Sequence, residues 1–356
     1  MRTLKSRSTH NNHNSNERGA IFVLVAILIV VLIGFAALAI DISSLYQEKR
    51  TLQNGADAAA LAVAKDCALT SCDPSIADTY ADLNADDGGH NVDEVCGSGA
   101  GLTACADPPT VPAGAEYVRV TTSTYESSSG DDQVNFLFAP VLNLIAGGDL
   151  DGQTVRARAV AAWGSPRGAT TLPITFSLCE YQEFVPDADD LHEGPPFTGA
   201  PSTIYFHGST PAGSCPAGPS GFDLPGGFGW LETDADCRAV IEIGDWVSDD
   251  PGVSAPSCVD LTSLRNTVIL IPIYDQTNGL TGNNGEYHNA GFAAFYLTGY
   301  RFPGDRWPNG GPNNMTCPAE PGNSGTCLRG YFTTMTTTGT EFGGPDMGVT
   351  IVRLVG

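Results

Sequence analysis

The sequence predicts an α+β protein in which one long N-terminal helix precedes shorter helices and many short strands. Three observations support this fold class. Residues 20–65 contain no proline and place apolar and small side chains at helical spacing. From residue 165 onward, short apolar runs alternate with turns rich in Gly, Pro, Asn and Asp, which favours an antiparallel, sandwich-like domain. All ten cysteines follow residue 66, as expected for a domain held by disulfides.

The charge is divided along the chain. The 356 residues include 17 Lys and Arg and 40 Asp and Glu, which gives a formal net charge of −23. Residues 1–19 carry a net +3, residues 20–40 carry no charge, and the remainder carries −26. Such an acidic body repels a phosphate backbone, so the composition excludes a nucleic-acid-binding protein. The low charged fraction of 16% fits an envelope or secreted protein better than a cytosolic one.

Residues 20–40 predict a transmembrane helix. This run holds 21 apolar or small residues, which as a helix would extend ~31 Å and match the hydrocarbon core of a bilayer. The basic residues 1–19 precede the run and Asp41 follows it. The positive-inside rule therefore predicts a single-pass protein of the cytoplasmic membrane, with a basic cytoplasmic tail at 1–19 and an extracytoplasmic C-terminal domain.

Two kinds of N-terminal processing are alternatives to an uncleaved anchor. An Ala-x-Ala pattern at residues 37–39 is a possible signal-peptidase site, although the apolar run exceeds the usual h-region. Arg18-Gly19 before an apolar helix is similar to a prepilin leader. Pilins carry a glutamate five residues into the mature chain, whereas this sequence has Leu24 there. We expect the anchor to stay uncleaved.

Residues 41–66 predict that the helix continues outside the membrane. A narrow apolar stripe recurs there at three-, four- and seven-residue steps, formed by Leu45, Leu52, Ala56, Ala59, Ala60 and Val63. Alanine side chains allow close backbone approach, so the stripe requires a partner helix or a sheet. Two partners remain open, namely the chain's own ectodomain and another subunit, including a second copy in a homo-oligomer.

The order of motifs around this helix resembles the TadE/TadG-like segment of Flp (Tad) pilus assembly proteins. The resemblance covers about 50 residues: a glycine before the apolar run, an aspartate after it, an Arg-x-Leu-Gln sequence and an Ala-Asp-Ala-Ala-Ala-Leu-Ala run. We expect the motif residues to contact partner subunits; they are Gly19, Asp41, Arg50, Gln53, Asp57, Ala58 and Ala60. The sequence departs from the family at Asn54-Gly55, where the glycine favours a bend.

This resemblance implies a bacterial, membrane-anchored, non-catalytic component of a Flp pilus-assembly or secretion system, with other pilus-assembly subunits as partners. Four stretches in the second half of the chain also resemble the extracytoplasmic part of TadG-related proteins: 227–231, 268–275, 291–295 and 330–332. The size of the 165–356 region supports an alternative function, that of an anchored extracytoplasmic domain with its own binding or glycan-directed activity.

The part beyond the helix divides near residues 164–168, a Gly-Ser-Pro-Arg-Gly sequence. In residues 67–164 we expect a short helix at 74–83, a strand at 118–124, a helix at 134–145 interrupted by Pro140, and a strand at 154–163. A long helix followed by such elements is pilin-like, by analogy of fold only. Residues 165–356 form the β-rich ectodomain, with strands expected at 172–178, 203–207, 240–243, 267–274, 292–301, 328–335 and 349–355.

The ten cysteines predict five disulfides, because their number is even and all lie on the oxidising side of the membrane. They are Cys67, Cys72, Cys96, Cys105, Cys179, Cys215, Cys237, Cys258, Cys317 and Cys327. Proximity in the sequence favours the pairs 67–72, 96–105 and 317–327, and it leaves the other four to pair among themselves. Metal binding is the rival interpretation, but the Cys-x-x-Cys spacing typical of zinc sites is absent.

The sequence contains no recognisable catalytic motif, so we expect neither an enzyme nor a cofactor or metal. Residues 82–93 resemble a calcium loop, but the glycine is one place late and an aspartate replaces the final glutamate. A solvated acidic loop is therefore expected there. Asp41 is expected to anchor the membrane boundary. Asp57, on the alanine-rich face, should be either solvated or paired with an arginine of a partner chain.

Overall fold

The computed structural model describes most of the chain. The described residues are 17–70, 72–84, 90–125, 130, 132–138, 152–205, 228–250, 255–278, 284–309, 316–317, 326–339 and 341–355, without the side chains of 17–20 and 228. Residues 1–16 of the basic N-terminal segment and most of the helix expected at 134–145 therefore lie outside the described residues. The predicted α+β class is confirmed, since a long N-terminal helix is followed by a β-rich region.

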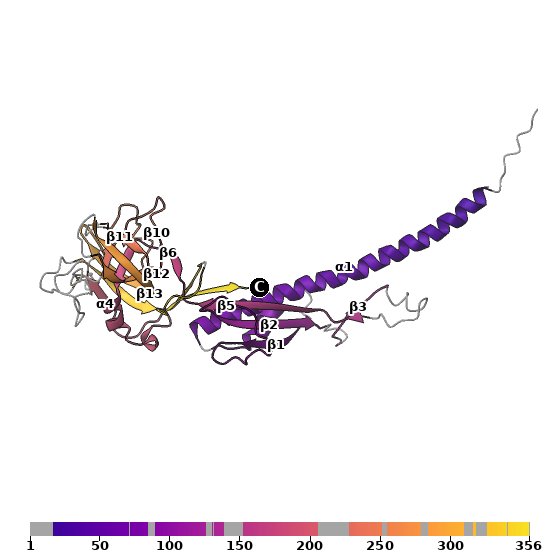
Figure 1. Cartoon of the computed structure of the whole chain (residues 1–356), viewed down its shortest axis with the longest axis horizontal. Coiled ribbons are helices and arrows are strands. Elements are labelled where there is room, and N and C mark those ends of the chain that lie inside the picture. The colour runs from indigo at the N-terminus through magenta and orange to yellow at the C-terminus, as the bar shows by residue number, and fades with distance from the viewer. Residues whose placement is uncertain are drawn as a thin grey trace, which may run out of the picture.

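Helix α1 runs from Glu17 to Leu69, a stretch of 53 residues or ~80 Å. Its N-terminal half projects away from the rest of the molecule, whereas its C-terminal half lies along a sheet (Figure 1). The helix continues through Gly55, where the sequence favours a bend. A second, short helix, α2 (Ile76–Asp82), packs against this buried half of α1.

The sheet beneath α1 has five strands in the order β1-β2-β5-β17-β16. Pairing is antiparallel throughout except between β16 and β17, which run parallel. The strands are β1 (His90–Gly97), β2 (Glu116–Thr124), β5 (Arg156–Gly164), β16 (Met335–Thr337) and β17 (Val349–Leu354). The last strand of the chain thus lies beside β5, although the sequence groups it with the β-rich region beyond residue 165.

The second body is a curled sheet with the strand order β8-β15-β13-β12-β7-β9, to which β11 and β14 add by pairing with β13. Its longest strand, β13, has 17 residues and pairs with four others. The strands are β7 (Ile174–Ser177), β8 (Ser202–Tyr205), β9 (Phe228–Trp230), β11 (Trp246–Ser248), β12 (Val268–Thr277), β13 (Glu286–Phe302), β14 (Asp305–Trp307) and β15 (Cys327–Thr333).

Two small sheets and two short helices complete the described part of the fold. β6 (Gly168–Thr171) pairs with β10 (Ala239–Glu242), and β3 (Val134–Asn135) pairs with β4 (Gly152–Gln153). The helix α4 (Leu178–Phe184) follows β7, and the 3₁₀ turn η1 (Ala188–Asp190) comes soon after it. The β-rich region is therefore one large mixed sheet with a small companion rather than a sandwich of two comparable sheets.

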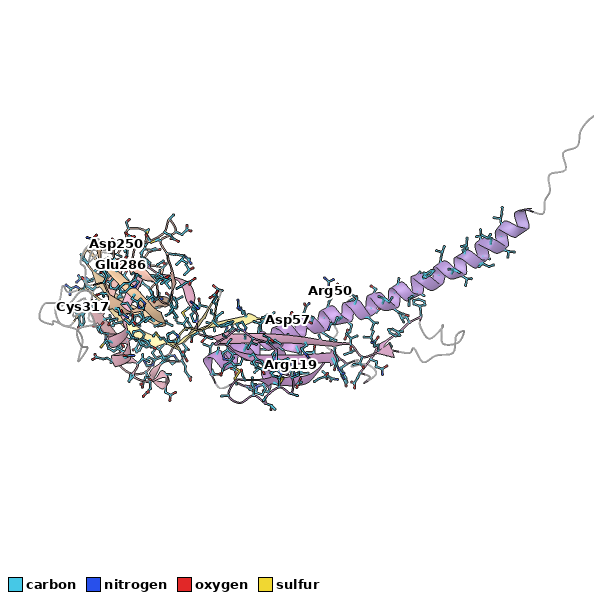
Figure 2. The ribbon with its side chains drawn as sticks, in the orientation of Figure 1. Arg50, Asp57, Arg119, Asp250, Glu286 and Cys317 are labelled. Carbon is cyan, nitrogen blue, oxygen red and sulfur yellow. A yellow bond between two sulfur atoms is a disulfide. The ribbon has the colours of Figure 1, made fainter. Side chains whose placement is uncertain are left out.

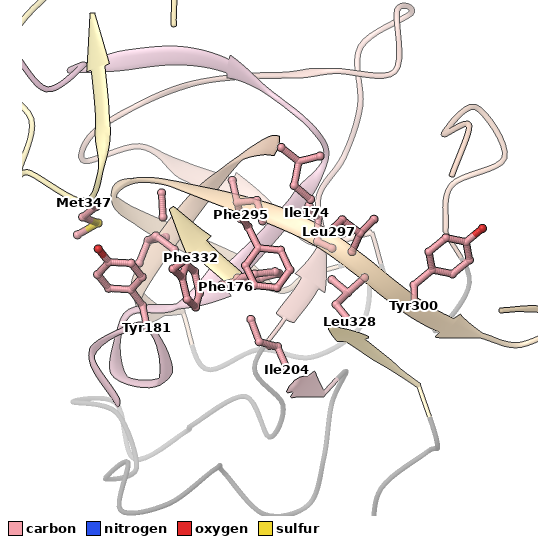
Figure 3. Packing of buried hydrophobic residues seen from close by; sticks show 14 of the residues in the cluster. Ile174, Phe176, Tyr181, Ile204, Phe295, Leu297, Tyr300, Leu328, Phe332 and Met347 are labelled. Atoms are coloured by element: carbon pink, nitrogen blue, oxygen red, sulfur yellow. The ribbon is translucent and has the colours of Figure 1, made fainter. Parts of the chain in front are cut away.

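The core of the second body is aromatic (Figure 3). Phe176 of β7 meets Phe295 of β13 edge-to-face, with ring centroids 5.4 Å apart, and Phe332 of β15 meets Phe295 at 5.1 Å. Tyr181 of α4 packs on Phe332 in the same way at 5.0 Å. Such edge-to-face pairs add to the stability gained from burial alone. They hold α4 and three strands around one centre.

Two local expectations were wrong. The pattern at 134–145 predicts a helix, yet Val134 and Asn135 form strand β3, because apolar spacing in so short a run does not separate helix from strand. The strand expected at 172–178 stops at Ser177, and Leu178 begins α4. The short helix expected at 74–83 starts at Ile76, with Ser75 at its N-cap. The remaining strands expected beyond residue 165 are present, with shifted ends.

Candidate membrane and assembly interface

The N-terminal half of α1 presents an unbroken apolar surface. From Ile21 to Ile40 its side chains are exposed, apart from the partly exposed Ala37. Examples are Phe22, Val30 and Phe35, with exposed fractions of 79%, 70% and 68%. By length and composition, α1 is long and apolar enough to cross a membrane. A soluble protein rarely leaves so large an apolar patch in water.

Asp41 marks the end of this apolar surface and is itself buried, with only 4% of its surface exposed. Its carboxylate accepts hydrogen bonds from the backbone amide of Leu137 (3.0 Å to Oδ1) and from that of Phe138 (3.2 Å to Oδ2). The residue therefore holds a segment that lies 96 residues later in the chain. Sequence reasoning marked Asp41 as a boundary residue but missed this contact, because nothing in the local pattern points to residues 137 and 138.

The C-terminal half of α1 buries its apolar stripe against the chain's own sheet. The buried stripe residues are Leu52, Ala56, Ala59, Ala60, Val63 and Ala64. The sheet offers equally small residues, since β5 contributes Ala157, Ala159 and Ala161 to the same core. Alanine on both sides lets the helix backbone approach the sheet closely. Of the two partners that the sequence leaves open for this stripe, the structure shows the chain's own sheet.

Polar contacts fasten the same helix face to the edges of the strands. Lys49 donates through its ammonium to the carbonyl of Arg156, and Gln53 donates through its amide to the carbonyl of Arg158 at 3.0 Å. Thr122 of β2 donates its hydroxyl to the carbonyl of Leu52 at 3.1 Å. These contacts fix the register of α1 on the sheet. The sequence motif includes Gln53 but gives no sign of Lys49 or Thr122.

The expected motif residues occupy different environments. Asp57 is half-buried and accepts a hydrogen bond from the amide of Gln53 at 2.8 Å, one helical turn away. This intrahelical contact of Asp57 was not expected from the sequence. Arg50 is exposed, faces away from the sheet in Figure 2, and lies over the ring of Tyr46 at 5.5 Å. Ala58 is half-buried and Ala60 is fully buried. The burial of Gly19 lies outside what the structure describes.

Gly55 lies where α2 crosses α1. A Cβ atom added to Gly55 would lie 3.5 Å from the carbonyl oxygen of Ala81 and 3.6 Å from its Cα, which is ordinary van der Waals contact. The helix is continuous here and the glycine is buried. The Asn54-Gly55 departure from the family pattern is therefore associated with a helix crossing rather than with a bend.

Disulfides close the loops of both bodies. The structure joins Cys67 to Cys72 and Cys96 to Cys105 in the first body, and Cys237 to Cys258 and Cys317 to Cys327 in the second. Cys179 is disulfide-bonded as well, and Cys215 lies outside the described residues. The three bridges expected from proximity in the sequence are thus present. Each links cysteines no more than ten residues apart.

The loop between Cys96 and Cys105 is also held by a buried cation. Arg119 of β2 is buried and forms an ion pair with Glu94 of β1 at 3.0 Å. Its guanidinium also donates to the carbonyl of Asp107, beyond the second cysteine (Figure 2 labels Arg119). A charged group inside a protein requires such partners to offset its lost hydration. Arg119 thus ties the loop to the edge of the sheet.

The structure describes only the ends of the acidic loop at residues 82–93, where the sequence resembles a calcium loop. Residues 85–89 lie outside the described part of the chain. At its ends, Asp82 pairs with His90 at 3.3 Å, whereas Asp93 accepts from the Ser123 hydroxyl at 2.7 Å and pairs with Arg156 at 3.3 Å. Among the residues that the structure describes, no three His, Cys, Asp or Glu side chains are grouped to hold a metal ion.

Two acidic groups in the second body have distinctive environments. Asp249 is buried, and its burial together with the nearby Asp250 carboxylate raises its pKa to about 6. Asp275 lies 2.6 Å from Nδ1 of His288, and both side chains are partly exposed. The indole of Trp246 packs on the His288 ring, with centroids 5.2 Å apart. Asp249 thus lies beside another carboxylate, whereas Asp275 pairs with a histidine that also contacts Trp246.

Comparison with known proteins assigns one segment of this interface. Residues 19–66 match the Flp pilus-assembly TadE/G-like family (Tad), which confirms the resemblance seen in the motifs. The matched segment includes the exposed apolar run, Asp41 and the buried alanine stripe. No curated protein and no solved structure matches the chain. The helix that joins the apolar surface to the β-containing bodies is therefore similar, from residue 19 to residue 66, to the TadE/G-like family of Flp pilus assembly.

Proposed function

We propose that this chain is a non-catalytic, membrane-anchored component of a bacterial Flp pilus-assembly or secretion system. The family match at residues 19–66 supports a part in Flp pilus assembly. In this proposal the N-terminal tail lies in the cytoplasm, α1 crosses the cytoplasmic membrane once, and both β-containing bodies lie outside it. The basic tail, the uncharged run and the acidic remainder support that orientation.

One observation carries the proposal: α1 has two halves with opposite environments. Residues 21–40 expose apolar side chains on all sides, and residues 52–64 bury a narrow stripe in the ectodomain core. A helix that is apolar all round is stable in a bilayer, whereas one with a single apolar stripe packs on a protein surface. Since the helix is continuous between the two halves, the ectodomain is rigidly connected to the membrane anchor.

Contacts with partner subunits are proposed for the surfaces that the fold leaves uncovered. Ala60 is fully buried by the chain's own sheet, so it supports assembly only indirectly, by holding the helix in place. The apolar run at 21–40 is the larger uncovered surface and can pack on other helices within the bilayer. Outside it, Arg50 and Ala58 provide a smaller surface for other pilus-assembly subunits or a second copy of this chain.

The anchor is tested by a charge placed in the middle of the run. Leu32 is 64% exposed, and Leu32→Arg adds a charge that costs ~2.5–3.5 kcal/mol at the centre of a transmembrane helix. The matched control is Leu83→Arg, at a 75% exposed leucine beyond α2. Each variant is expressed in a strain that lacks the wild-type gene, and membrane fractions, sheared surface pili and adhesion are measured.

We expect Leu32→Arg to lower the share of the protein in the membrane fraction and to reduce piliation, and Leu83→Arg to affect neither. Normal piliation with a soluble Leu32→Arg protein would refute the membrane-anchored role. Unchanged piliation in the strain without the gene would refute a part in pilus assembly. These outcomes separate anchoring from assembly.

A further inference from the structure

Two apolar side chains lie in the open beside the buried Asp41. Leu137 is 71% exposed and Phe138 is 38% exposed, although the backbone of both residues is fixed by hydrogen bonds to the Asp41 carboxylate. The short strand β3, which leads into them, pairs with β4 and contacts α1. The two side chains are thus held at a defined place against the helix and are left uncovered by the described parts of the fold.

The helix sets the level of these side chains relative to the apolar run. Asp41 directly follows Ile40, the last residue of the run. In an α-helix the side chain of each residue is tilted toward the N-terminus, so the Asp41 carboxylate lies over the preceding turn. The amides of residues 137 and 138 bind that carboxylate, so they lie within about one turn, ~5 Å, of the end of the run.

The surroundings favour lipid as the occupant of this surface. The two side chains continue the exposed apolar surface of α1, which includes Ile40 (46% exposed) and Ile42 (56% exposed). The sequence from Val134 to Gly148 contains no charged residue, in an ectodomain whose net charge is −26. A stretch without charge lacks the electrostatic complementarity that steers and orients a protein partner. Leucine and phenylalanine are typical of side chains that enter the headgroup boundary.

We propose that Leu137 and Phe138 insert into the outer interface of the lipid bilayer and form a second, shallow membrane contact beside α1. This inference rests on the membrane-anchored role proposed above. With two contacts on the bilayer, the ectodomain has a fixed rotation about the helix axis. Asp41 holds the insertion segment against the helix, so its carboxylate is a positioning group for membrane contact.

The proposal is tested by tryptophan quenching in the full-length protein. The chain is reconstituted into vesicles of phosphatidylethanolamine and phosphatidylglycerol, with lipids brominated either near the headgroup or deep in the acyl chains. Three single variants are compared with the parent chain: Phe138→Trp reports the insertion segment, Leu32→Trp reports the middle of the apolar run, and Val240→Trp is the control. Val240 is 73% exposed on β10, in the second body.

We expect the added fluorescence of Phe138→Trp to be quenched about twofold by headgroup-proximal bromine and less by deep bromine, as for a residue at the boundary. Leu32→Trp should show the reverse preference, and Val240→Trp should not be quenched. Quenching of Leu32→Trp without that of Phe138→Trp would overturn this inference while leaving the anchor intact. Failure of both would overturn the anchor itself. Leu137→Trp, assayed in the same way, repeats the test at the neighbouring, more exposed position.

Discussion

The carboxylate of Asp41 accepts a hydrogen bond from the backbone N–H of Leu137 at 3.0 Å, which joins the end of the apolar half of α1 to a segment 96 residues later. The neighbouring amide of Phe138 binds the other oxygen at 3.2 Å. Because both donors are backbone groups, the contact depends on the position of the segment and not on its side chains. A single acidic residue thus both follows the apolar run and attaches the segment around residues 137 and 138 to its end.

Removing this carboxylate should release the segment. Asp41→Ala leaves two backbone amides without their acceptor, and hydrogen bonds to a charged group contribute ~1.5–3 kcal/mol each. We expect hydrogen exchange at Leu137 and Phe138 to accelerate by on the order of tenfold or more. Asp41→Asn, which keeps one carbonyl acceptor, should show a smaller effect. Ser44→Ala is the control, because that hydroxyl donates to the carbonyl of Ile40 in the same helix. Exchange at Leu137 and Phe138 that is equally slow in Asp41→Ala and in the parent chain would contradict the role of the Asp41 carboxylate.

The packing of α1 on the sheet predicts a contrast between neighbouring alanines. Ala60 is fully buried in the helix–sheet core, so Ala60→Leu should overpack it and lower the free energy of unfolding by ~1–3 kcal/mol. Ala58 is half-buried, and Ala58→Leu should change stability by less than ~0.5 kcal/mol. Denaturant unfolding of the full chain in micelles measures both. A loss of piliation in a stable Ala58→Leu variant would indicate a partner at that face, whereas equal stability of the two variants would argue against the helix–sheet packing.

The crossing of α1 and α2 makes Gly55 replaceable by alanine but not by a larger residue. The added Cβ would make ordinary contacts with Ala81, and alanine is favoured over glycine in a helix by up to ~1 kcal/mol. We therefore expect Gly55→Ala to raise stability by ~0.5–1 kcal/mol and Gly55→Leu to lower it. Gly97→Ala is the contrasting case, because its Cβ would collide with the carbonyl of Tyr117. A destabilised Gly55→Ala would show that the crossing tolerates no side chain.

Asp249 predicts a pH dependence of stability. Burial, with a contribution from the Asp250 carboxylate, raises its pKa from 3.8 in the unfolded chain to about 6 in the folded protein. Between these values the folded protein binds the extra proton, so stability falls as the pH rises from about 4 to about 6, by about 1–3 kcal/mol. Asp249→Asn should remove this slope and stabilise the protein at neutral pH. The free energy of unfolding is measured against pH for the parent chain and for Asp249→Asn, and the difference between the two profiles isolates the contribution of Asp249. Parallel profiles would contradict the raised pKa of Asp249.

Much of the first body could be predicted from periodicity, because its elements are long or strongly patterned. The apolar residues from Leu52 to Val63 recur at helical spacing on one side, so the sequence predicts both the helix and its buried face. Strands β2 and β5 follow clear alternation and appear within two residues of their expected ends. Val134 and Asn135 were misassigned because a short apolar run is compatible with either helix or strand.

The candidate interface was predictable only in part. Asp41, Gln53 and Ala60 were identified through the family resemblance, but their contacts depend on residues distant in the sequence. Gln53 bonds to the carbonyl of Arg158, 105 residues away. Asp57 accepts a hydrogen bond from Gln53 of its own helix, a contact that the motif does not specify. A motif records which residues recur, whereas the choice of partner depends on which strand edge the fold brings alongside.

The sequence by itself determined the long helix, its apolar and amphipathic halves, the division of charge and the local disulfides, because each depends on residues close together in the chain. Only the tertiary structure decided what the stripe packs against, that the last strand returns to the first sheet, and that Asp41 holds residues 137 and 138. These features depend on long-range packing, in which many small contacts act together. Periodicity shows which face of an element is buried, but not which distant element covers that face.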